Sequence, residues 1–130
     1  MYSKIIGTGH YLPEKIVTND DLAKTIDTSH TWIVERTGIH QRHIAAEEEQ
    51  CTDLAYHAAV EALKDAKIAA EELDLILLAT STPDQTYPST ATLVQERLGN
   101  VGAASFDLSA ACSGFVYALG VADNFIKAGS

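Results

Sequence analysis

One mostly apolar stretch, "LDLILLATS" at 73–81, with five apolar residues in a row at 75–79 and small polar residues at its end, limits the folds open to this chain more than any other feature. Strands inside a parallel sheet, with both faces covered, show continuous apolar runs of this kind instead of alternation. A helix-forming segment, "PSTATLVQERLG", comes next, and a second strand-like segment, "AASFDLS" at 103–109, follows it. A strand, a helix and a second strand at this spacing predict a right-handed parallel crossover. We therefore predict an α/β fold with a mostly parallel sheet.

The remaining segments are consistent with that fold class. The segment "CTDLAYHAAVEALKDA" places Leu54 and several alanines on one face, which predicts a helix over 51–66, capped by Thr52, that packs closely on a sheet. The paired glycines Gly7 and Gly9 fit a turn better than a dinucleotide-binding loop, because the third glycine of that motif is missing. Other patterns predict a first strand at 3–9, helices that begin near 19 and 27, an extended segment at 39–45, and an apolar, buried helix from 114.

Length, composition and charge exclude several classes of protein. A chain of 130 residues suits one compact domain, and its 46% hydrophobic and 21% charged residues are ordinary for a soluble protein. The formal net charge of −9 disfavours binding to nucleic acid or to an anionic membrane. The two cysteines lack the spacing of a disulfide framework, and neither a signal peptide nor a membrane-spanning segment is evident. We therefore expect a cytoplasmic protein.

Cys112 lies in "FDLSAACSGFVYALG", between the second strand and the apolar helix. Ligands of parallel sheets gather beyond the carboxyl ends of the strands, and free N–H groups at a helix start stabilise a thiolate and an oxyanion. Ala110 and Gly114, two positions to either side, match the spacing of small residues in a nucleophile elbow. Cys112 is therefore a candidate nucleophile, and the alternative is a thiol that fills space in the core, the commoner role of a free cysteine. Cys51 lacks this context, which favours a structural role.

The same segment closely resembles the active-site segment of the β-ketoacyl-acyl-carrier-protein synthase III family of condensing enzymes. "IIGTGHYLPEKIVTNDDL", "DTSHTWIVERTGIHQRHIA" and "LDLILLATSTPDQTYPSTA" are similar to other segments of this family in the same order, so the resemblance covers essentially all 130 residues. It implies a thiolase-like layered fold and a homodimer. Family members are more than twice as long, so residues 1–130 are expected to form an N-terminal thiolase-like domain that lacks the C-terminal half.

The resemblance implies an acyltransferase that initiates fatty acid synthesis. In the family, a cysteine thiolate takes an acyl group, typically acetyl, from acyl-CoA. Malonyl-acyl carrier protein then loses CO2, and the resulting carbanion equivalent attacks the acyl-enzyme to give a 3-oxoacyl product. No metal or redox cofactor is implied. The histidine and asparagine that assist this second step lie in the C-terminal half of the family, so we expect the chain alone to be inactive in condensation.

The resemblance also assigns roles to individual residues. Cys112 matches the nucleophile, and its backbone N–H matches one donor of the oxyanion hole. Trp32 matches the aromatic residue on which the adenine of CoA stacks, while Thr28 and Arg36 match neighbouring CoA contacts. Tyr87 matches an aromatic residue that the family places across the dimer interface near the acyl pocket, where relatives often carry phenylalanine. From the residues alone, a core role for Trp32 and a solvated surface charge for Arg36 remain open.

Two further functions stay open alongside this one. The chain could belong to a related acyltransferase that uses the same cysteine with a different acceptor, or it could be a non-catalytic CoA-binding or assembly fragment that needs a complementary half. A metal site at His40 and His43 is disfavoured, because two histidines without a third ligand make a poor site. An isolated chain of this kind should expose a sheet edge and an apolar helix.

Overall fold

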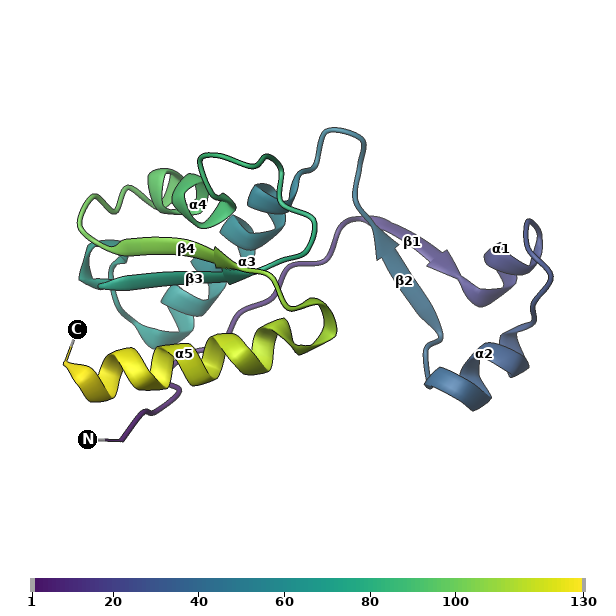
Figure 1. Cartoon of the computed structure of the whole chain (residues 1–130). Coiled ribbons are helices and arrows are strands. Elements are labelled where there is room, and N and C mark those ends of the chain that lie inside the picture. Colours follow the sequence, from purple (N-terminus) through teal and green to yellow (C-terminus); the bar gives the residue numbers. More distant parts are fainter. Residues whose placement is uncertain (1, 130) are drawn as a thin grey trace. The chain divides into compact units, whose positions relative to one another are not determined.

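The computed structural model describes residues 2–129, which divide into two compact units (Figure 1). The first, here called the α/β unit, contains residues 2–11 and 50–129. The second, here called the small unit, contains residues 12–49. Within residues 2–129, no helix is both long enough and apolar enough to cross a bilayer.

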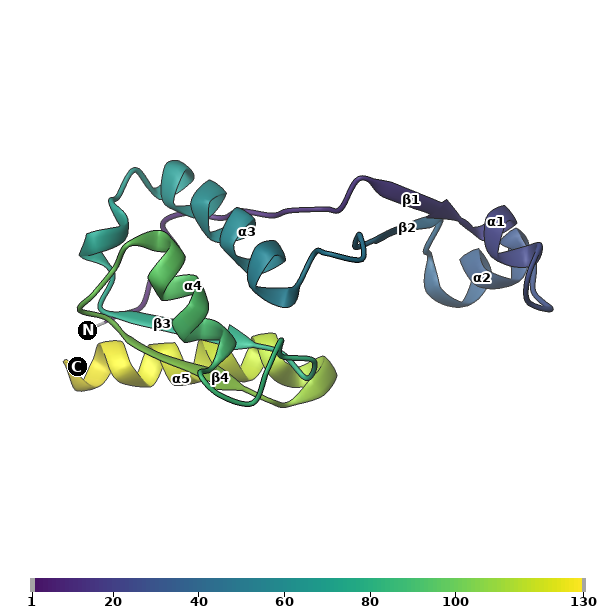
Figure 2. The same ribbon diagram turned by 90° about the horizontal axis from the view of Figure 1, so that it is seen from above.

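The α/β unit contains the crossover that the apolar run predicts. Its elements are α3 (Cys51–Ala66), η1 (Ala70–Glu72), β3 (Leu75–Ala79), α4 (Thr90–Leu98), β4 (Ala104–Leu108), η2 (Ala111–Ser113) and α5 (Gly114–Ala128). Strands β3 and β4 pair in parallel, with Leu75 opposite Ala104 and Ala79 opposite Leu108. Helix α4 connects them and packs on one side of the pair, and α5 lies on the other side (Figures 1 and 2). The predicted α/β class is confirmed.

The most deeply buried apolar side chains hold α4 against the strands. Ala91 and Val94 on α4 are 0% and 2% exposed, and Ala103, which leads into β4, is 9% exposed. Helix α3 packs against α4, and an ion pair between Arg97 and Asp53, 2.6 Å apart, joins the two helices. A backbone hydrogen bond from Gln50 and then the Arg97 guanidinium lower the pKa of Asp53. Helices α3 and α4 are thereby fixed to each other beside the parallel strands.

Helix α5 begins where the sequence predicts, but it is not buried. Phe115, Val116 and Tyr117 are 71%, 66% and 58% exposed. The expectation of a fully buried helix is wrong for this chain, because β3 and β4 cover only one face of α5 and these three side chains lie away from it. Apolar surface of this extent favours association with another surface. The expectation that the chain exposes an apolar helix is confirmed.

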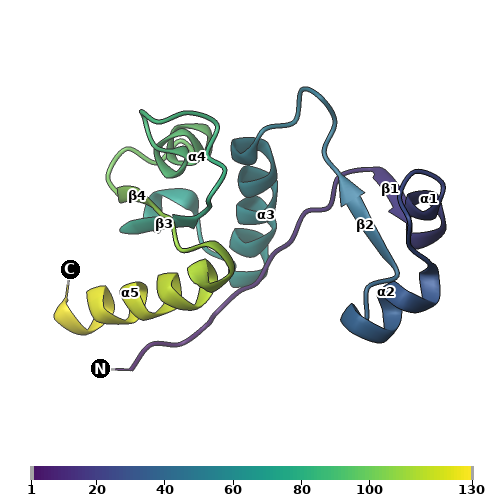
Figure 3. The same cartoon turned by 45° about the vertical axis from the view of Figure 1, so that its right-hand side comes forward.

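The N-terminal segment differs from its predicted form. Residues 3–9 are extended but form no strand, and they run along α3 (Figure 3). A Cβ atom placed on Gly7 would come within 2.6 Å of the Ala62 carbonyl oxygen and the Ala66 side chain, and one on Gly9 would collide with the α3 backbone. The glycines therefore serve this close approach to α3 and not a turn after a strand.

We expect Gly9→Ala to lower the free energy of unfolding by about 1–3 kcal/mol, because the new methyl group meets backbone atoms that cannot rotate away. Urea denaturation followed by circular dichroism measures this change. Gly102→Ala is the matched control, because open space surrounds a Cβ at that position. Equal unfolding midpoints for the two variants would contradict the close approach.

The small unit contains β1 (Lys15–Thr18), α1 (Asn19–Ala23), α2 (His30–Thr37) and β2 (Gln41–Ile44). The two helices and the extended β2 confirm the sequence predictions, while β1, which pairs with β2 in antiparallel fashion, was not predicted. Asn19 is completely buried between them. Its side-chain amide donates to the Ile39 carbonyl at 2.7 Å, and its oxygen accepts from Arg42 at 2.8 Å. This one polar side chain therefore links α1, the end of α2 and β2.

Candidate active site

Cys112 lies in a tight turn between β4 and α5. Strand β4 ends at Leu108, and the single 3-10 turn η2 leads directly into α5. Ala111 has a φ of 44°, which is the left-handed region that a residue with a Cβ enters at a cost of about 1–2 kcal/mol. A strained residue between a strand and a helix is the device that exposes the nucleophile in hydrolase elbows. The same device here presents the Cys112 thiol, which is exposed.

Gly114 explains why small residues are needed after the cysteine. It is the first residue of α5 and is buried, and a Cβ added to it would lie 3.1 Å from the Ala79 Cβ at the end of β3. Such a contact is tighter than normal packing tolerates without movement. The glycine therefore lets α5 start directly against the strand, which brings the turn to the carboxyl edge of the parallel pair.

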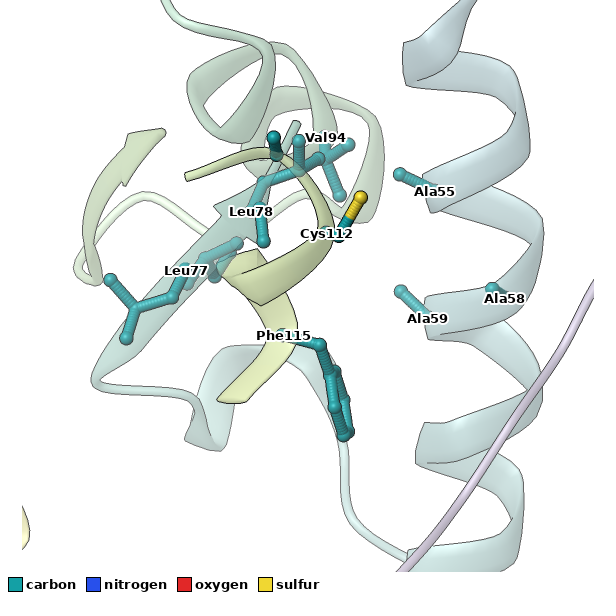
Figure 4. Close-up of a pocket in the computed structure, with 11 residues that line it drawn as sticks. Ala55, Ala58, Ala59, Leu77, Leu78, Val94, Cys112 and Phe115 are labelled. Atoms are coloured by element: carbon teal, nitrogen blue, oxygen red, sulfur yellow. The ribbon is translucent and has the colours of Figure 1, made fainter. Parts of the chain in front are cut away.

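The thiol faces an apolar cavity of about 560 Å³. Side chains of α3, β3, α4, η2 and the first turn of α5 line it: Ala55, Ala58, Ala59, Ile76, Leu77, Leu78, Ala79, Val94, Ala111, Cys112 and Phe115. Figure 4 shows the Cys112 sulfur directed toward Ala55 on α3, with Leu78 and Val94 on the opposite side. Small-molecule sites have volumes of about 300–1,000 Å³ and mostly apolar linings. The cavity is therefore suited to an acyl chain bound next to the sulfur.

The backbone of the turn leaves one donor free beside the thiol. The Ser113 N–H donates to the Ala110 carbonyl at 3.0 Å, and the Ala111 N–H donates to the Ser81 hydroxyl at 3.2 Å. The Cys112 N–H has no hydrogen-bond partner within residues 2–129. An N–H at this position can donate to the oxygen of a carbonyl that the thiolate attacks. The Cys112 N–H, the expected oxyanion donor, is therefore available to bind a substrate oxygen.

The wall that faces the thiol is held by Asp84, in the loop after β3. Its carboxylate accepts from the backbone N–H groups of Cys51 at 2.6 Å and Thr52 at 3.0 Å, and it also accepts from the Thr52 hydroxyl. Thr52 was predicted to cap α3, but the N-cap is Gln50, two residues earlier, and Asp84 accepts from the N–H groups of the first two helical residues. Cys51 is partly buried and its thiol lies 3.6 Å from the Thr80 hydroxyl, which agrees with a structural role.

In the small unit, Thr28 and Trp32 line a second hollow of about 570 Å³ together with Ile26, Asp27 and Ser29. Trp32 is 52% exposed, so it is not a core residue. The Arg36 guanidinium lies 4.4 Å from the centre of the indole ring, and the Thr28 hydroxyl is buried without a partner among the described residues. The three predicted CoA contacts thus lie on one short segment. Trp32 supplies a flat ring, Arg36 a cation, and Thr28 a hydroxyl without a partner among the described residues.

Tyr87, the remaining predicted site residue, lies in the loop between β3 and α4 and is 88% exposed. It is not among the residues that line the Cys112 cavity.

The histidines of the small unit form no metal site among the described residues. His30 and His40 have their ring centres 5.5 Å apart, and residues 2–129 hold no group of three or more histidine, cysteine or acidic side chains arranged for a metal ion. Ser81, whose hydroxyl accepts from the Ala111 N–H, was not predicted, because a contact between residues thirty positions apart leaves no local sequence pattern.

The chain is similar in sequence and fold to several known proteins. The sequence model of 3-oxoacyl-acyl-carrier-protein synthase III matches residues 106–130, which include the Cys112 turn and α5. A β-ketoacyl-acyl-carrier-protein synthase III from Rhodospirillum centenum is 62% identical over 127 residues, which are 98% of this chain and 39% of the relative. The crystal structure of 3-oxoacyl-acyl-carrier-protein synthase III from Aquifex aeolicus is 59% identical, with a TM-score of 0.91 over 97% of this chain and 41% of that one.

A more distant structure, the priming β-ketosynthase of a polyketide pathway, is 35% identical with a TM-score of 0.90 over 95% of this chain and 37% of that one. The α/β unit and its cysteine turn are therefore those of the thiolase-like condensing enzymes. Within that class, the relatives that it matches along nearly its whole length are β-ketoacyl-acyl-carrier-protein synthases III, the family that the sequence resembles. It spans about 40% of the length of the curated relatives that it matches.

Proposed function

We propose that this chain is the part of a β-ketoacyl-acyl-carrier-protein synthase III that carries its nucleophile and its CoA contacts, and that the intact enzyme starts fatty acid synthesis in the cytoplasm. One observation carries the proposal: an exposed thiol, following a left-handed residue, faces an apolar cavity beside an unpaired backbone N–H. A structural cysteine needs none of these features, because it would be buried and surrounded. The proposed reaction needs no metal or redox cofactor.

The first step follows from the geometry of the turn. The Cys112 thiolate attacks the thioester carbonyl of acetyl-CoA, and the carbonyl oxygen takes on negative charge while the Cys112 N–H donates to it. The bond to CoA then breaks, CoA leaves as a thiolate, and the acetyl group remains on the Cys112 sulfur. The apolar cavity beside the sulfur accommodates the methyl end of the acyl group.

The second step is assigned through the family. Malonyl-acyl carrier protein loses CO2, its carbanion equivalent attacks the acetyl carbonyl, and the cysteine leaves as a thiolate, so the product is a 3-oxoacyl-acyl carrier protein. The histidine and asparagine that the family uses for this step belong to its C-terminal half. The proposal therefore includes a homodimer of the intact enzyme, with Tyr87 at the dimer interface near the acyl pocket, and no condensation by the 130-residue chain alone.

The proposal is tested by mass spectrometry. The chain is mixed with the C-terminal part of the Rhodospirillum centenum relative, incubated with acetyl-CoA, and the intact mass is measured. We expect the gain of one acetyl group, located at Cys112 by peptide mapping. Absence of the adduct would overturn the proposal, and a 3-oxoacyl product formed by the chain alone would overturn the claim that condensation needs the C-terminal part.

The proposed CoA contacts give a separate prediction. Because Trp32 is the only tryptophan, its fluorescence reports on its own environment, and adenine stacking on the ring should quench it. We expect Trp32→Ala to weaken CoA binding by about 10-fold, a loss within the range of one base–aromatic stack. Binding of CoA to this variant is measured by calorimetry, with Tyr2→Ala as the exposed aromatic control. Equal affinities for the variant and the control would contradict the assignment.

A second candidate is a condensing enzyme that uses the same cysteine with another acceptor. The priming β-ketosynthase of a polyketide pathway supports this second candidate, because it has the same fold as this chain, with a TM-score of 0.90. Competition between malonyl-acyl carrier protein and malonyl-CoA for the acetylated, complemented enzyme distinguishes the two. A non-catalytic assembly fragment would bind the complementary half but would acquire no acetyl group.

A further inference from the structure

The turn that carries Cys112 is tied to the loop that follows the neighbouring strand. Beyond the last paired residues of β3 and β4, the Thr80 N–H donates to the Leu108 carbonyl at 3.1 Å, which extends the ladder by one bond. One residue further along, the Ser81 hydroxyl accepts from the Ala111 N–H at 3.2 Å. The loop bends back on itself here, because the Thr82 N–H donates to the Thr80 hydroxyl at 3.1 Å. Ser81 thus lies in a bend that places its hydroxyl opposite Ala111.

This contact separates the roles of two adjacent backbone donors. Ala111 and Cys112 each have an N–H at the start of η2, and only the first has a partner within residues 2–129. If the Ala111 N–H were also free, water or a carbonyl oxygen could bind at either donor, and the left-handed Ala111 would lose the hydrogen bond that ties it to the loop after β3. The hydroxyl of Ser81 removes both possibilities.

We propose that Ser81 is a positioning residue for Cys112: its hydroxyl binds the Ala111 N–H, holds Ala111 in the left-handed conformation, and leaves the Cys112 N–H as the donor for the substrate oxygen. This inference rests on the proposed function, since it concerns the same nucleophile. Ser81 touches no reacting atom and acts only through the backbone of Ala111.

The test uses the chain complemented with the C-terminal part of the Rhodospirillum centenum relative, with Ser81→Ala, Ser81→Thr and Thr82→Ala in the chain. The threonine variant keeps a hydroxyl at the position, and Thr82→Ala removes a neighbouring hydroxyl that makes no contact with the turn. Amide hydrogen exchange at Ala111, resolved by NMR, is the first readout. Loss of one hydrogen bond should raise its exchange rate about 2- to 10-fold in Ser81→Ala, with wild-type rates in the other two variants.

The second readout compares acetylation and alkylation of the Cys112 thiol. It distinguishes a role of Ser81 in positioning the Cys112 N–H from a general loosening of the turn. Alkylation by iodoacetamide builds no oxyanion, whereas transfer from acetyl-CoA does. Ser81→Ala should therefore lower the ratio of the acetylation rate to the alkylation rate at Cys112 by about 2- to 10-fold. Cys51 alkylation, read in the same digest, should not change.

The outcomes distinguish this inference from the proposed function. Unchanged Ala111 exchange in Ser81→Ala overturns the inference, whether or not the chain is acetylated. A changed exchange rate with an unchanged reaction ratio also overturns it, since the contact would then be structural only. Absence of acetylation in the wild-type complemented enzyme defeats the proposed function, while the exchange measurement still decides whether Ser81 holds the turn.

Discussion

Replacing Cys112 with serine should abolish formation of the acetyl-enzyme in the complemented protein, with a fall in acyl transfer of the order of 10³-fold or more. The substitution is nearly isosteric and the side chain is exposed, so the fold should be retained. A serine hydroxyl at this position is a weak nucleophile, because it stays protonated at neutral pH where a thiol is partly ionised. Intact-protein mass spectrometry after incubation with acetyl-CoA measures the loss directly.

Cys51→Ser provides the matched control for this result. Cys51 is partly buried at the start of α3, and its thiol lies 3.6 Å from the Thr80 hydroxyl and does not line the Cys112 cavity, so removal of its sulfur should leave acetylation at the wild-type rate. Acetylation that survives in Cys112→Ser and disappears in Cys51→Ser would reverse the assignment. Loss in both variants, together with an altered circular dichroism spectrum, would indicate damage to the fold and not to the nucleophile.

The parts of this structure that could be predicted depend on short-range pattern. The apolar run at 73–81 identified β3, and the capping and glycine signals around 89–99 identified α4, because helix and strand periods are local properties. The crossover rule then fixed how β3 and β4 pair without further information. Cys112 was found for the same reason, since its small neighbours and its place between a strand and a helix are visible in fifteen letters.

The parts that could not be predicted depend on contacts between distant segments. Gly7 and Gly9 pack against α3, more than forty residues away, so their pattern was interpreted as a local turn. Ser81 and Ala111 are thirty residues apart and meet only because β3 and β4 pair in one register. The exposure of Phe115 depends on which surfaces are present to cover α5. An apolar sequence shows that a helix tends to be buried, but it does not show which surface buries it.

Asp107→Ala should lower the free energy of unfolding by about 2–4 kcal/mol, which is a large share of the stability of a small domain. The Asp107 carboxylate, on β4, accepts from the backbone N–H groups of Thr90 at 2.9 Å and Ala91 at 2.8 Å. Both residues are 0% exposed, so water cannot replace the lost acceptor and two buried donors remain unpaired. Urea denaturation followed by circular dichroism gives the change in unfolding free energy.

The effect of this variant should extend to the thiol, because the helix that Asp107 holds also forms a wall of the cavity. Val94, one turn into α4, lines the cavity opposite α3, and a displaced α4 would open that side to water. Asp107→Asn keeps one acceptor oxygen and should lose less stability. Asp123→Ala, which removes a partly exposed carboxylate that pairs with Lys127 on α5, should lose little, because such a surface ion pair contributes about 0–1 kcal/mol. If Asp107→Ala unfolded at the same urea concentration as Asp123→Ala, the capping contact would not be what holds α4 on the strands. The walls of the cavity would then depend on the packing of Ala91 and Val94 alone.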